Sequence, residues 1–426
     1  MLHRRNFLKL AGATCLGTAV GAPSSLVAAP PTGRRLRMAV VTTIWRYHSH
    51  AWHMAERFLH GYPQQGRWHH PEIDVVSAYV DQIGDNDLSR GRAEESGFTI
   101  YPTVAEALRC GKDKLDVDCV LLIGEHGNYE KTEFGQTMYP RYELFKQVTQ
   151  VFREDGRTTP IFNDKHLSWN YDWAVEMVEE SRELEFPFLA GSSLPVTWRM
   201  PSIDMPYGAE VEEVMCVAMG RPDSYDFHAL ETIQCMVERR KGGETGVVSM
   251  EAFRGQKVWD ALESKSWSAG GWDPALFEAC LSRSHTLAQS ETASHRYPTL
   301  QQMHEWVKDP IAYRFEYADG LKATMLLMNG LVNDFTFSAR LKGDQRYLST
   351  LFQLPPNPNV VYSAALMEGA EEMFRTRVAP WPIERTLLTT GLVQAGVQSL
   401  TKETRLETPQ LDVAYTAPRK SLFWRT

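Results

Sequence analysis

The chain has 426 residues, of which 43% are hydrophobic and 23% are charged, and its formal net charge is −8. A chain of this length is long enough for two domains with their own cores, and this composition excludes a largely disordered protein. The acidic balance makes nucleic acid and anionic lipid poor partners.

The first 29 residues differ from the rest. Arg4 and Arg5 precede Phe-Leu-Lys and a weakly apolar run at 10–20, and small residues stand at 27–29. This pattern is typical of a twin-arginine signal peptide, so we expect export to the periplasm or beyond through the twin-arginine machinery. The apolar run is too short to span a bilayer, so no membrane span is expected. Removing residues 1–29 takes away three of the 45 basic residues and no acidic one, which leaves 42 against 53 and a net charge of −11.

The cysteines do not indicate a disulfide framework. Five remain after the signal, at positions 110, 119, 216, 235 and 280, and none has Cys-x-x-Cys spacing. An odd number in mostly apolar surroundings predicts buried free thiols rather than disulfides or a zinc site.

Strands and helices alternate as far as residue 200. Apolar runs predict strands at 36–43, 73–80, 117–124, just before Asn163, and at 186–190. Helical spacing predicts helices from about His50, after Thr103, around 144–152, and after Ser168 or Asn170. The polar segment 62–70 is expected to form an inserted loop. This order predicts a parallel sheet with helices on its faces.

The last strand-helix-strand unit points to a site. Its first strand ends in the polar residues Asn163, Asp164, Lys165 and His166. Ligands of open parallel sheets bind at the carboxyl ends of the strands, so these four side chains are candidates for a binding site. The alternative is an ordinary charged loop between a strand and a helix.

The loop after the first strand lacks the glycines of a dinucleotide-binding turn. Those glycines let a pyrophosphate approach the backbone at the helix end. In their place we expect the side chains of Trp45, Arg46 and Tyr47 to crowd that approach. Either a nucleotide binds in a shifted pose, or the pocket has another use. The polar residues that a nucleotide would meet in this loop are Thr42, Thr43, Arg46 and His48.

Two acids follow neighbouring strands at the same edge. Asp81 follows the second strand, where such folds place the acid that binds the adenosine ribose, and Glu125 follows the next one. Both are interpreted as cofactor-binding residues, although a lone acid after a strand is also an ordinary surface residue.

From Met200 the pattern changes to short alternating segments. They lie at 211–219, 246–253, 311–317, 321–328 and 334–341, several of them joined by glycine-containing turns. This pattern predicts an antiparallel sheet. One helix interrupts it and carries Asp226, His228 and Glu231. We therefore expect a signal peptide at 1–29, a Rossmann-like domain at 30–200 and an α+β domain at 201–426.

These features resemble the Gfo/Idh/MocA family of glucose-fructose oxidoreductases and inositol dehydrogenases. Asp164-Lys165-His166 is similar to the family's Glu-Lys-Pro triplet, and His228 matches the histidine of its Asp-x-x-x-His motif, with Ser224 in place of the aspartate. The resemblance implies an α/β Rossmann-like domain followed by an α+β domain with a largely antiparallel open sheet. It also implies NAD or NADP as cofactor and a homo-oligomer that pairs through the open face of the second sheet.

The resemblance implies hydride transfer from a carbohydrate or cyclitol hydroxyl. Such a reaction needs a base for the proton and a cation for the developing alkoxide. His228 is expected to be the base, Lys165 to hold the oxygen and to hydrogen-bond the base, and Asp164 to complete the catalytic set. The expected substrate-binding residues are Asn163, His166, Arg199, Asp226 and Glu231.

Two other hypotheses stay open. In the first, Glu125, His126, Asp164, His166, His228 and Glu231 supply ligands to a divalent metal for a lyase, isomerase or hydrolase. Adjacent residues on an extended run point apart, which argues against Glu125 and His126 binding one ion together. His48, His50 and His53 form a weaker metal cluster. In the second, the chain is a non-catalytic sugar-binding protein on a decayed dehydrogenase fold.

Overall fold

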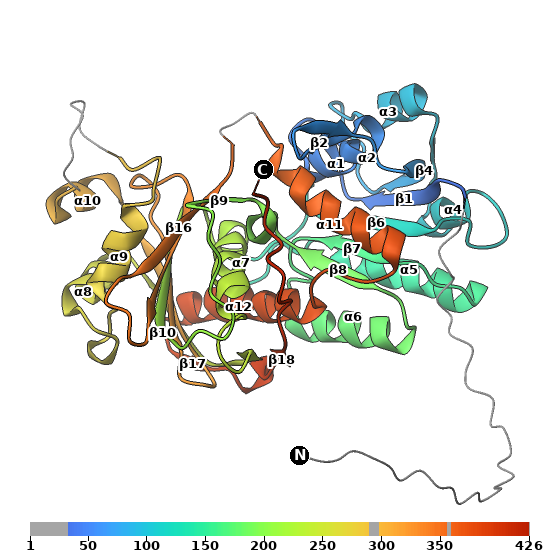
Figure 1. Cartoon of the computed structure of the whole chain (residues 1–426). Helices are drawn as coiled ribbons and strands as arrows, with labels where there is room; N and C mark the ends of the chain where they lie inside the picture. The colour runs from blue at the N-terminus through green and yellow to red at the C-terminus, as the bar shows by residue number, and fades with distance from the viewer. Residues whose placement is uncertain (1–32, 289–297, 356–358, 426) are drawn as a thin grey trace, which may run out of the picture.

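The computed structural model describes residues 33–288, 298–355 and 359–425. The two large β-sheets lie side by side, and each has helices on both faces (Figure 1). The expected signal peptide, residues 1–29, is outside the described residues. Within those residues, every helix is too short or too polar to cross a membrane.

The first sheet holds six parallel strands in the order β5-β4-β1-β6-β7-β8. They are β1 (Leu36–Thr42), β4 (Ile73–Val80), β5 (Thr99–Ile100), β6 (Cys119–Ile123), β7 (Ile161–Asp164) and β8 (Phe188–Gly191). Both faces are covered by helices, which explains why the central strands read as continuous apolar runs. The Rossmann-like first half is therefore confirmed.

Alternate side chains of this sheet enter two different cores. One core includes α4 (Val104–Arg109), α5 (Arg141–Asp155) and α6 (Tyr171–Glu183). The other includes α1 (His50–Met54), α2 (Glu56–His60) and α11 (Tyr362–Thr376), with α3 (Ser89–Ser96) at its margin. Helix α11 comes from near the C-terminus, so the first sheet is completed by residues far beyond position 200 (Figure 1).

The second sheet has eight strands in the order β17-β12-β13-β14-β10-β15-β16-β9. They are β9 (Trp198–Met200), β10 (Val211–Ala218), β12 (Val247–Arg254), β13 (Ile311–Tyr317), β14 (Lys322–Leu327), β15 (Phe335–Leu341), β16 (Leu348–Gln353) and β17 (Leu406–Glu407). All neighbours are antiparallel except β10 and β14, which are parallel. The largely antiparallel sheet is confirmed.

Helices cover both faces of the second sheet as well. On one side lie α7 (Tyr225–Val237) and α12 (Ile383–Lys402). On the other lie α8 (Gln256–Ser264), α9 (Pro274–Leu281) and α10 (Leu300–Trp306), which bury Met215, Val217 and Leu326 of the sheet. Pairing of two copies through a bare sheet face was expected, but this face is already covered by the chain's own helices.

The segment expected to be an inserted loop forms a β-hairpin. It consists of β2 (Tyr62–Gln64) and β3 (Arg67–His69). The hydroxyl of Tyr62 donates to Glu371 of α11 over 2.6 Å, and the His69 ring lies 2.9 Å from the same carboxylate. The hairpin was missed because its polar side chains pair with a carboxylate of α11, which lies 302 and 309 positions later in the chain. The remaining short elements are β11 (Glu244–Thr245), β18 (Ala414–Tyr415) and the 3₁₀ turns Leu194–Val196, Trp267–Ala269 and Pro409–Leu411.

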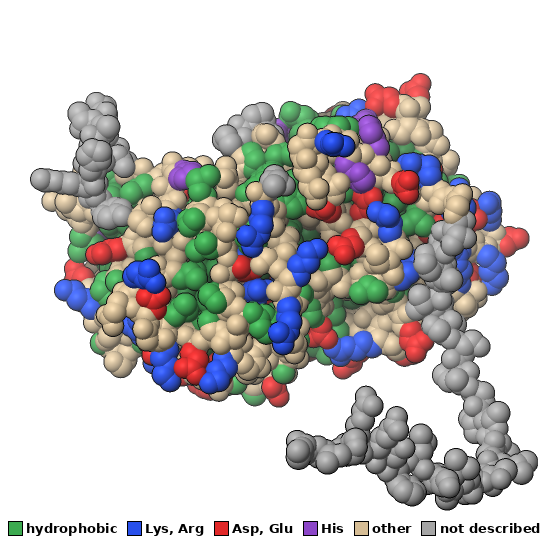
Figure 2. Space-filling view, viewed as in Figure 1, with side chains coloured by type: hydrophobic (Ala, Val, Ile, Leu, Met, Phe, Trp, Pro, Cys, Tyr) green, Lys and Arg blue, Asp and Glu red, His purple; other side chains and the backbone are tan. Residues whose placement is uncertain are grey.

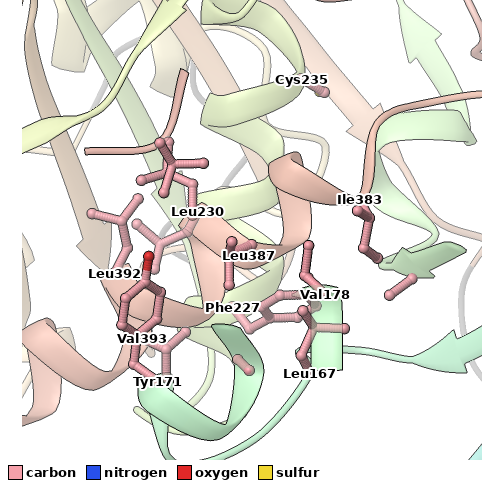
Figure 3. Close-up of a cluster of buried hydrophobic side chains, with 14 of the residues drawn as sticks. Leu167, Tyr171, Val178, Phe227, Leu230, Cys235, Ile383, Leu387, Leu392 and Val393 are labelled. Carbon is pink, nitrogen blue, oxygen red and sulfur yellow. The ribbon is translucent and has the colours of Figure 1, made fainter. Parts of the chain in front are cut away.

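Helix α12 holds the two halves together. Its apolar side chains lie among those of α6, which belongs to the first sheet, and of α7, which belongs to the second (Figure 3). The labelled members of this cluster are Leu167, Tyr171, Val178, Phe227, Leu230, Cys235, Ile383, Leu387, Leu392 and Val393. The two sheets thus share one continuous core, which fixes α7 relative to the carboxyl edge of the first sheet.

The five described cysteines are free, as expected from their number and spacing, and four of them are buried while Cys110 is partly exposed.

On the face shown in Figure 2, acidic and basic side chains are interspersed.

Candidate active site

The loop after β1 is tied to the end of β6. The hydroxyl of Thr42 donates to the carbonyl of Ile123 over 3.0 Å, and that of Thr43 donates to the carbonyl of Glu125 over 2.7 Å. Ser49 caps α1 by accepting from the backbone N–H of Trp52. The two threonines thus connect the ends of β1 and β6, and their hydroxyl protons are donated to backbone carbonyls rather than to a ligand.

The expectation that Trp45 crowds a ligand in this loop is wrong. Its side chain is fully buried, stacks on Phe98 with a centroid distance of 5.8 Å, and donates from its indole N–H to Glu56. Tyr47 is exposed, and its ring packs against those of His48 and Trp52, with centroid distances of 4.1 and 4.5 Å. His48 has a φ of 63°, the left-handed conformation for which such turns normally use glycine. The loop makes its turn without glycine.

Asp81 stands exposed at the end of β4. Its carboxylate accepts from the hydroxyl of Tyr79 over 3.0 Å and from that of Tyr129 over 2.6 Å. The two phenol hydroxyls orient the Asp81 carboxylate at the carboxyl edge of the first sheet, where the sequence predicts a binding site for the ribose of a nucleotide.

Lys165 lies at the carboxyl edge of the first sheet, and only 4% of it is exposed. Its backbone N–H donates to the carbonyl of Gly191 over 3.1 Å, and its φ is 61°. The ammonium donates to Glu125 over 3.1 Å, and the other oxygen of that carboxylate pairs with Arg141. Burial would raise the pKa of Glu125, but the charges of Lys165 and Arg141 outweigh it and hold that pKa well below its usual value. Two buried cations therefore share one carboxylate.

Asp164 forms a second buried pair with His50, the first residue of α1. The carboxylate lies 2.6 Å from Nδ1 of the imidazole. Burial, together with the nearby charge of Glu125, raises the pKa of Asp164 to about 7, whereas burial and then Lys165 lower that of His50. The His50 ring is also 5.0 Å from that of His126 and 4.6 Å from that of His53.

His228 reaches the same region from α7. Its Nδ1 lies 2.6 Å from the hydroxyl of Ser192, the residue after β8. Burial lowers the pKa of His228 well below 6.5, and the next largest cause is the charge of Lys165. The imidazole is thus neutral near pH 7 and lies within the field of Lys165. The expected hydrogen bond from Lys165 to His228 is absent, because the ammonium donates to Glu125 instead.

The other expected substrate residues take different positions. Asn163 donates to the backbone carbonyls of Asp164 and His166, over 3.1 and 3.3 Å, and the His166 ring lies 3.1 Å from the Arg141 guanidinium. Asp226 is fully buried and accepts from the hydroxyl of Tyr313 over 3.2 Å. Each of these three residues thus has a polar group that is engaged by a neighbouring protein group around the site.

The structure does not bring Arg199 to this cluster. Its guanidinium pairs with Asp204 over 2.6 Å and lies between the rings of Phe352 and Phe423, at 4.7 and 4.3 Å from their centroids. It also contacts Cys235, two helical turns beyond His228. Arg199 is therefore not among the residues that meet at this cluster, because its charge is paired with Asp204 within the core.

Glu231 is buried one turn after His228, and burial raises its pKa to about 7 from an ordinary 4.5. A carboxyl with a raised folded-state pKa contributes stability that is complete below the unfolded pKa and is lost as the pH rises through the folded one. We expect Glu231→Gln to increase the free energy of unfolding relative to the native chain at pH 8, by up to about 3 kcal/mol, and not at pH 4. Thermal unfolding at the two pH values measures this, and an equal change at both would contradict it.

Gly191 allows the close contact between β8 and α7. Its φ is 132°, and a Cβ at this position would lie 2.9 Å from the Glu231 carboxylate. We expect Gly191→Ala to lower the free energy of unfolding by about 1–3 kcal/mol, because it adds both strain and a clash. Gly91 in α3 has open space around its Cβ position and no positive φ, so Gly91→Ala should be neutral or stabilising. Denaturant unfolding of both variants tests this, and equal behaviour would contradict it.

The sequence did not reveal three members of the site. His50 was placed only in a weak metal cluster, and Arg141 and Ser192 were not singled out. The one available signal was the position of Ser192 just after a strand of the parallel sheet.

The residues expected to bind a metal do not converge. Glu125 pairs with Lys165 and Arg141, Asp164 with His50, and His228 with Ser192. Among the described residues, no group of three or more His, Cys, Asp or Glu side chains has the geometry to hold a metal ion.

The arrangement of the two sheets is that of the Gfo/Idh/MocA dehydrogenases. The chain is similar to myo-inositol 2-dehydrogenase from Lactobacillus plantarum, with a TM-score of 0.51 and 11% identity over 88% of this chain and 99% of that one. It is similar to GenD2 from gentamicin A biosynthesis, solved with NAD, with a TM-score of 0.53 and 12% identity over 88% and 96%. It is also similar to apo scyllo-inositol dehydrogenase from Lactobacillus casei, with a TM-score of 0.53 and 8% identity over 88% and 98%. No family model and no curated protein matches the sequence. At these identities the comparisons show the fold.

Proposed function

We propose that the chain is an enzyme that oxidises a carbohydrate or cyclitol hydroxyl by hydride transfer to a nicotinamide cofactor. The observation that carries this proposal is the geometry that brings Lys165 and His228 to the same sheet edge. The backbone N–H of Lys165 donates to the carbonyl of Gly191 over 3.1 Å, and the next residue, Ser192, lies 2.6 Å from Nδ1 of His228. Two such groups on a dehydrogenase fold match what the oxidation of a hydroxyl requires.

The roles follow from charge and protonation. Burial lowers the pKa of His228, so its imidazole is neutral near pH 7. The proposed role requires the tautomer whose Nδ1–H donates to the Ser192 hydroxyl, because Nε2 is then the proton acceptor. The Lys165 ammonium steadies the oxygen as negative charge develops. Glu125 holds that ammonium in place by accepting its hydrogen bond, and Arg141 in turn fixes the Glu125 carboxylate. Asp164 fixes the ring of His50 at the same edge.

The residues at the edge of the first sheet fit a dinucleotide. Asp81 offers an exposed carboxylate, oriented by two tyrosine hydroxyls, to a ribose. Arg46, which is partly exposed, offers a cation to a phosphate, and the indole ring of Trp45 is buried away from the loop surface. When bound, the nicotinamide supplies the hydride acceptor. GenD2, which has this fold, was solved with NAD. NAD and NADP are both candidates.

Titration with NAD, NADP and their reduced forms tests this proposal. We expect quenching of tryptophan fluorescence with at least one of them, and reduction of that cofactor, followed at 340 nm, in the presence of a cyclitol or sugar from a panel that includes myo-inositol and scyllo-inositol. Binding of none of the four would contradict hydride transfer.

We also propose that the chain is exported through the twin-arginine route and assembles as a homo-oligomer. The Arg4-Arg5 pair and the small residues at 27–29 support export. Fractionation of cells that express the native chain or the Arg4→Lys/Arg5→Lys variant tests it, since the variant should stay in the cytoplasm. Sedimentation of the mature protein gives the number of subunits.

A further inference from the structure

A pocket of about 380 Å³ opens beside the candidate active site, between the two halves of the chain. It lies where the loop after β6 meets the segment before α7, the end of β12 and the last turns of α12. Its polar lining consists mainly of Glu125, Lys131, Tyr139, Arg221, Asp223 and Arg254.

Two residues of the pocket wall lead to the catalytic candidates, which do not line the pocket themselves. Glu125, on its wall, accepts the hydrogen bond from Lys165. Ser224, also on its wall, is the N-cap of α7, four residues before His228. The pocket wall is thus one hydrogen bond from Lys165 and one helical turn from His228, which makes the pocket the nearest place for a further part of the substrate.

The pocket carries surplus positive charge. Lys131 and Arg221 are exposed, and neither side chain has an ion pair or hydrogen bond among the described residues. Surface cations elsewhere are often paired, for example Lys241 with Glu210. Glu125, on the pocket wall, pairs with two buried cations, Arg141 and Lys165, and its single negative charge neutralises only one of them. In a chain with a net charge of −8, this local excess of cations favours an anion.

Asp223 adds an acceptor to the same pocket. It has a φ of 60°, a costly backbone conformation for a residue other than glycine. One carboxylate oxygen accepts from the backbone N–H of Thr137 over 2.6 Å, and the other is buried without a partner. Burial raises the pKa of Asp223 to about 7, which reduces the negative charge it would hold against an anion. A sugar hydroxyl would satisfy the free oxygen.

We propose that the substrate is an anionic sugar, whose carboxylate or phosphate pairs with Lys131 and Arg221 while one of its hydroxyls donates to Asp223. This inference rests on the proposed function and narrows its substrate class. Charge-assisted hydrogen bonds from Lys and Arg are the strongest that such a pocket can offer, so they would dominate the choice between charged and neutral sugars.

Calorimetric titration with D-glucose, D-glucuronate and glucose 6-phosphate tests the proposal and separates the two anions. We expect one or both anionic sugars to bind about tenfold or more tightly than glucose to the mature protein, from one or two charge-assisted bonds. In Lys131→Gln/Arg221→Gln this preference should disappear, with binding of glucose changed less than about twofold. The control Lys241→Gln/Arg346→Gln removes two surface cations outside the pocket and should keep the preference.

Three results would overturn this inference: equal affinity for the three sugars, an equal loss in the control variant, or no binding of any of them. Failure here is distinguishable from failure of hydride transfer, because the cofactor titration is measured without any sugar and does not depend on Lys131 or Arg221. A protein that binds the cofactor and oxidises only neutral sugars overturns the anionic substrate alone. One that binds anionic sugars but no nicotinamide overturns hydride transfer alone.

Discussion

Replacing Lys165 by methionine is expected to lower kcat by about 10²–10³-fold, because the substrate oxygen loses the cation that steadies its developing charge. Methionine keeps much of the length and apolar character of the lysine stem. Arg141 remains to pair with Glu125, so no buried carboxylate is left without a partner. Steady-state kinetics with the preferred cofactor, together with thermal unfolding, measures the effect.

The matched control for this experiment is Lys241→Met. Lys241 is an exposed lysine that pairs with Glu210 far from the site. Native-like kinetics are expected for the control. A Lys165→Met protein that is folded and retains more than half of the native kcat would contradict the proposed role.

Replacing His228 by asparagine should lower kcat by about 10²–10⁴-fold, the usual contribution of a general base. The amide of asparagine reproduces the position of Nδ1 and keeps a hydrogen bond to Ser192, whereas the proton acceptor at Nε2 is lost. The fold should therefore be preserved while the proton transfer is removed.

A second histidine makes this result specific. His60 is half exposed and lies on α2, so His60→Asn should leave kcat unchanged. If His228→Asn were as active as His60→Asn, another group would have to accept the proton, and His50 with its Asp164 partner would be the first to test.

Much of the fold could be predicted because its signals are local. Continuous apolar runs and helical stripes located the parallel sheet, and alternating segments located most of the second sheet. Helix α12 was missed because it is buried between α6, α7 and the second sheet, so it lacks a polar face, and its threonines and glycines weaken the helical signal. Helix α11 was missed because no local pattern says that residues 362–376 return to the first sheet.

The site was predictable only in part, for a related reason. Lys165 and His228 were found through their place in motifs that resemble a known family. The partners of these residues depend on which side chains the tertiary fold brings near, and Ser192 beside His228 and His50 beside Asp164 are separated by 36 and 114 positions. Trp45 shows the opposite error, since an aromatic residue in a predicted ligand loop turned out to belong to the core.

The central claim is that Lys165 and His228 act on one small molecule, and the pKa of His228 tests it most directly. Burial sets most of the lowering, and the charge of Lys165 is the next cause. An NMR titration of isotope-labelled histidine should therefore give a higher pKa for His228 in Lys165→Met than in the native chain, with no change in Lys241→Met. An identical pKa in all three proteins would contradict an electrostatic contact between Lys165 and His228 and, with it, their action on one substrate.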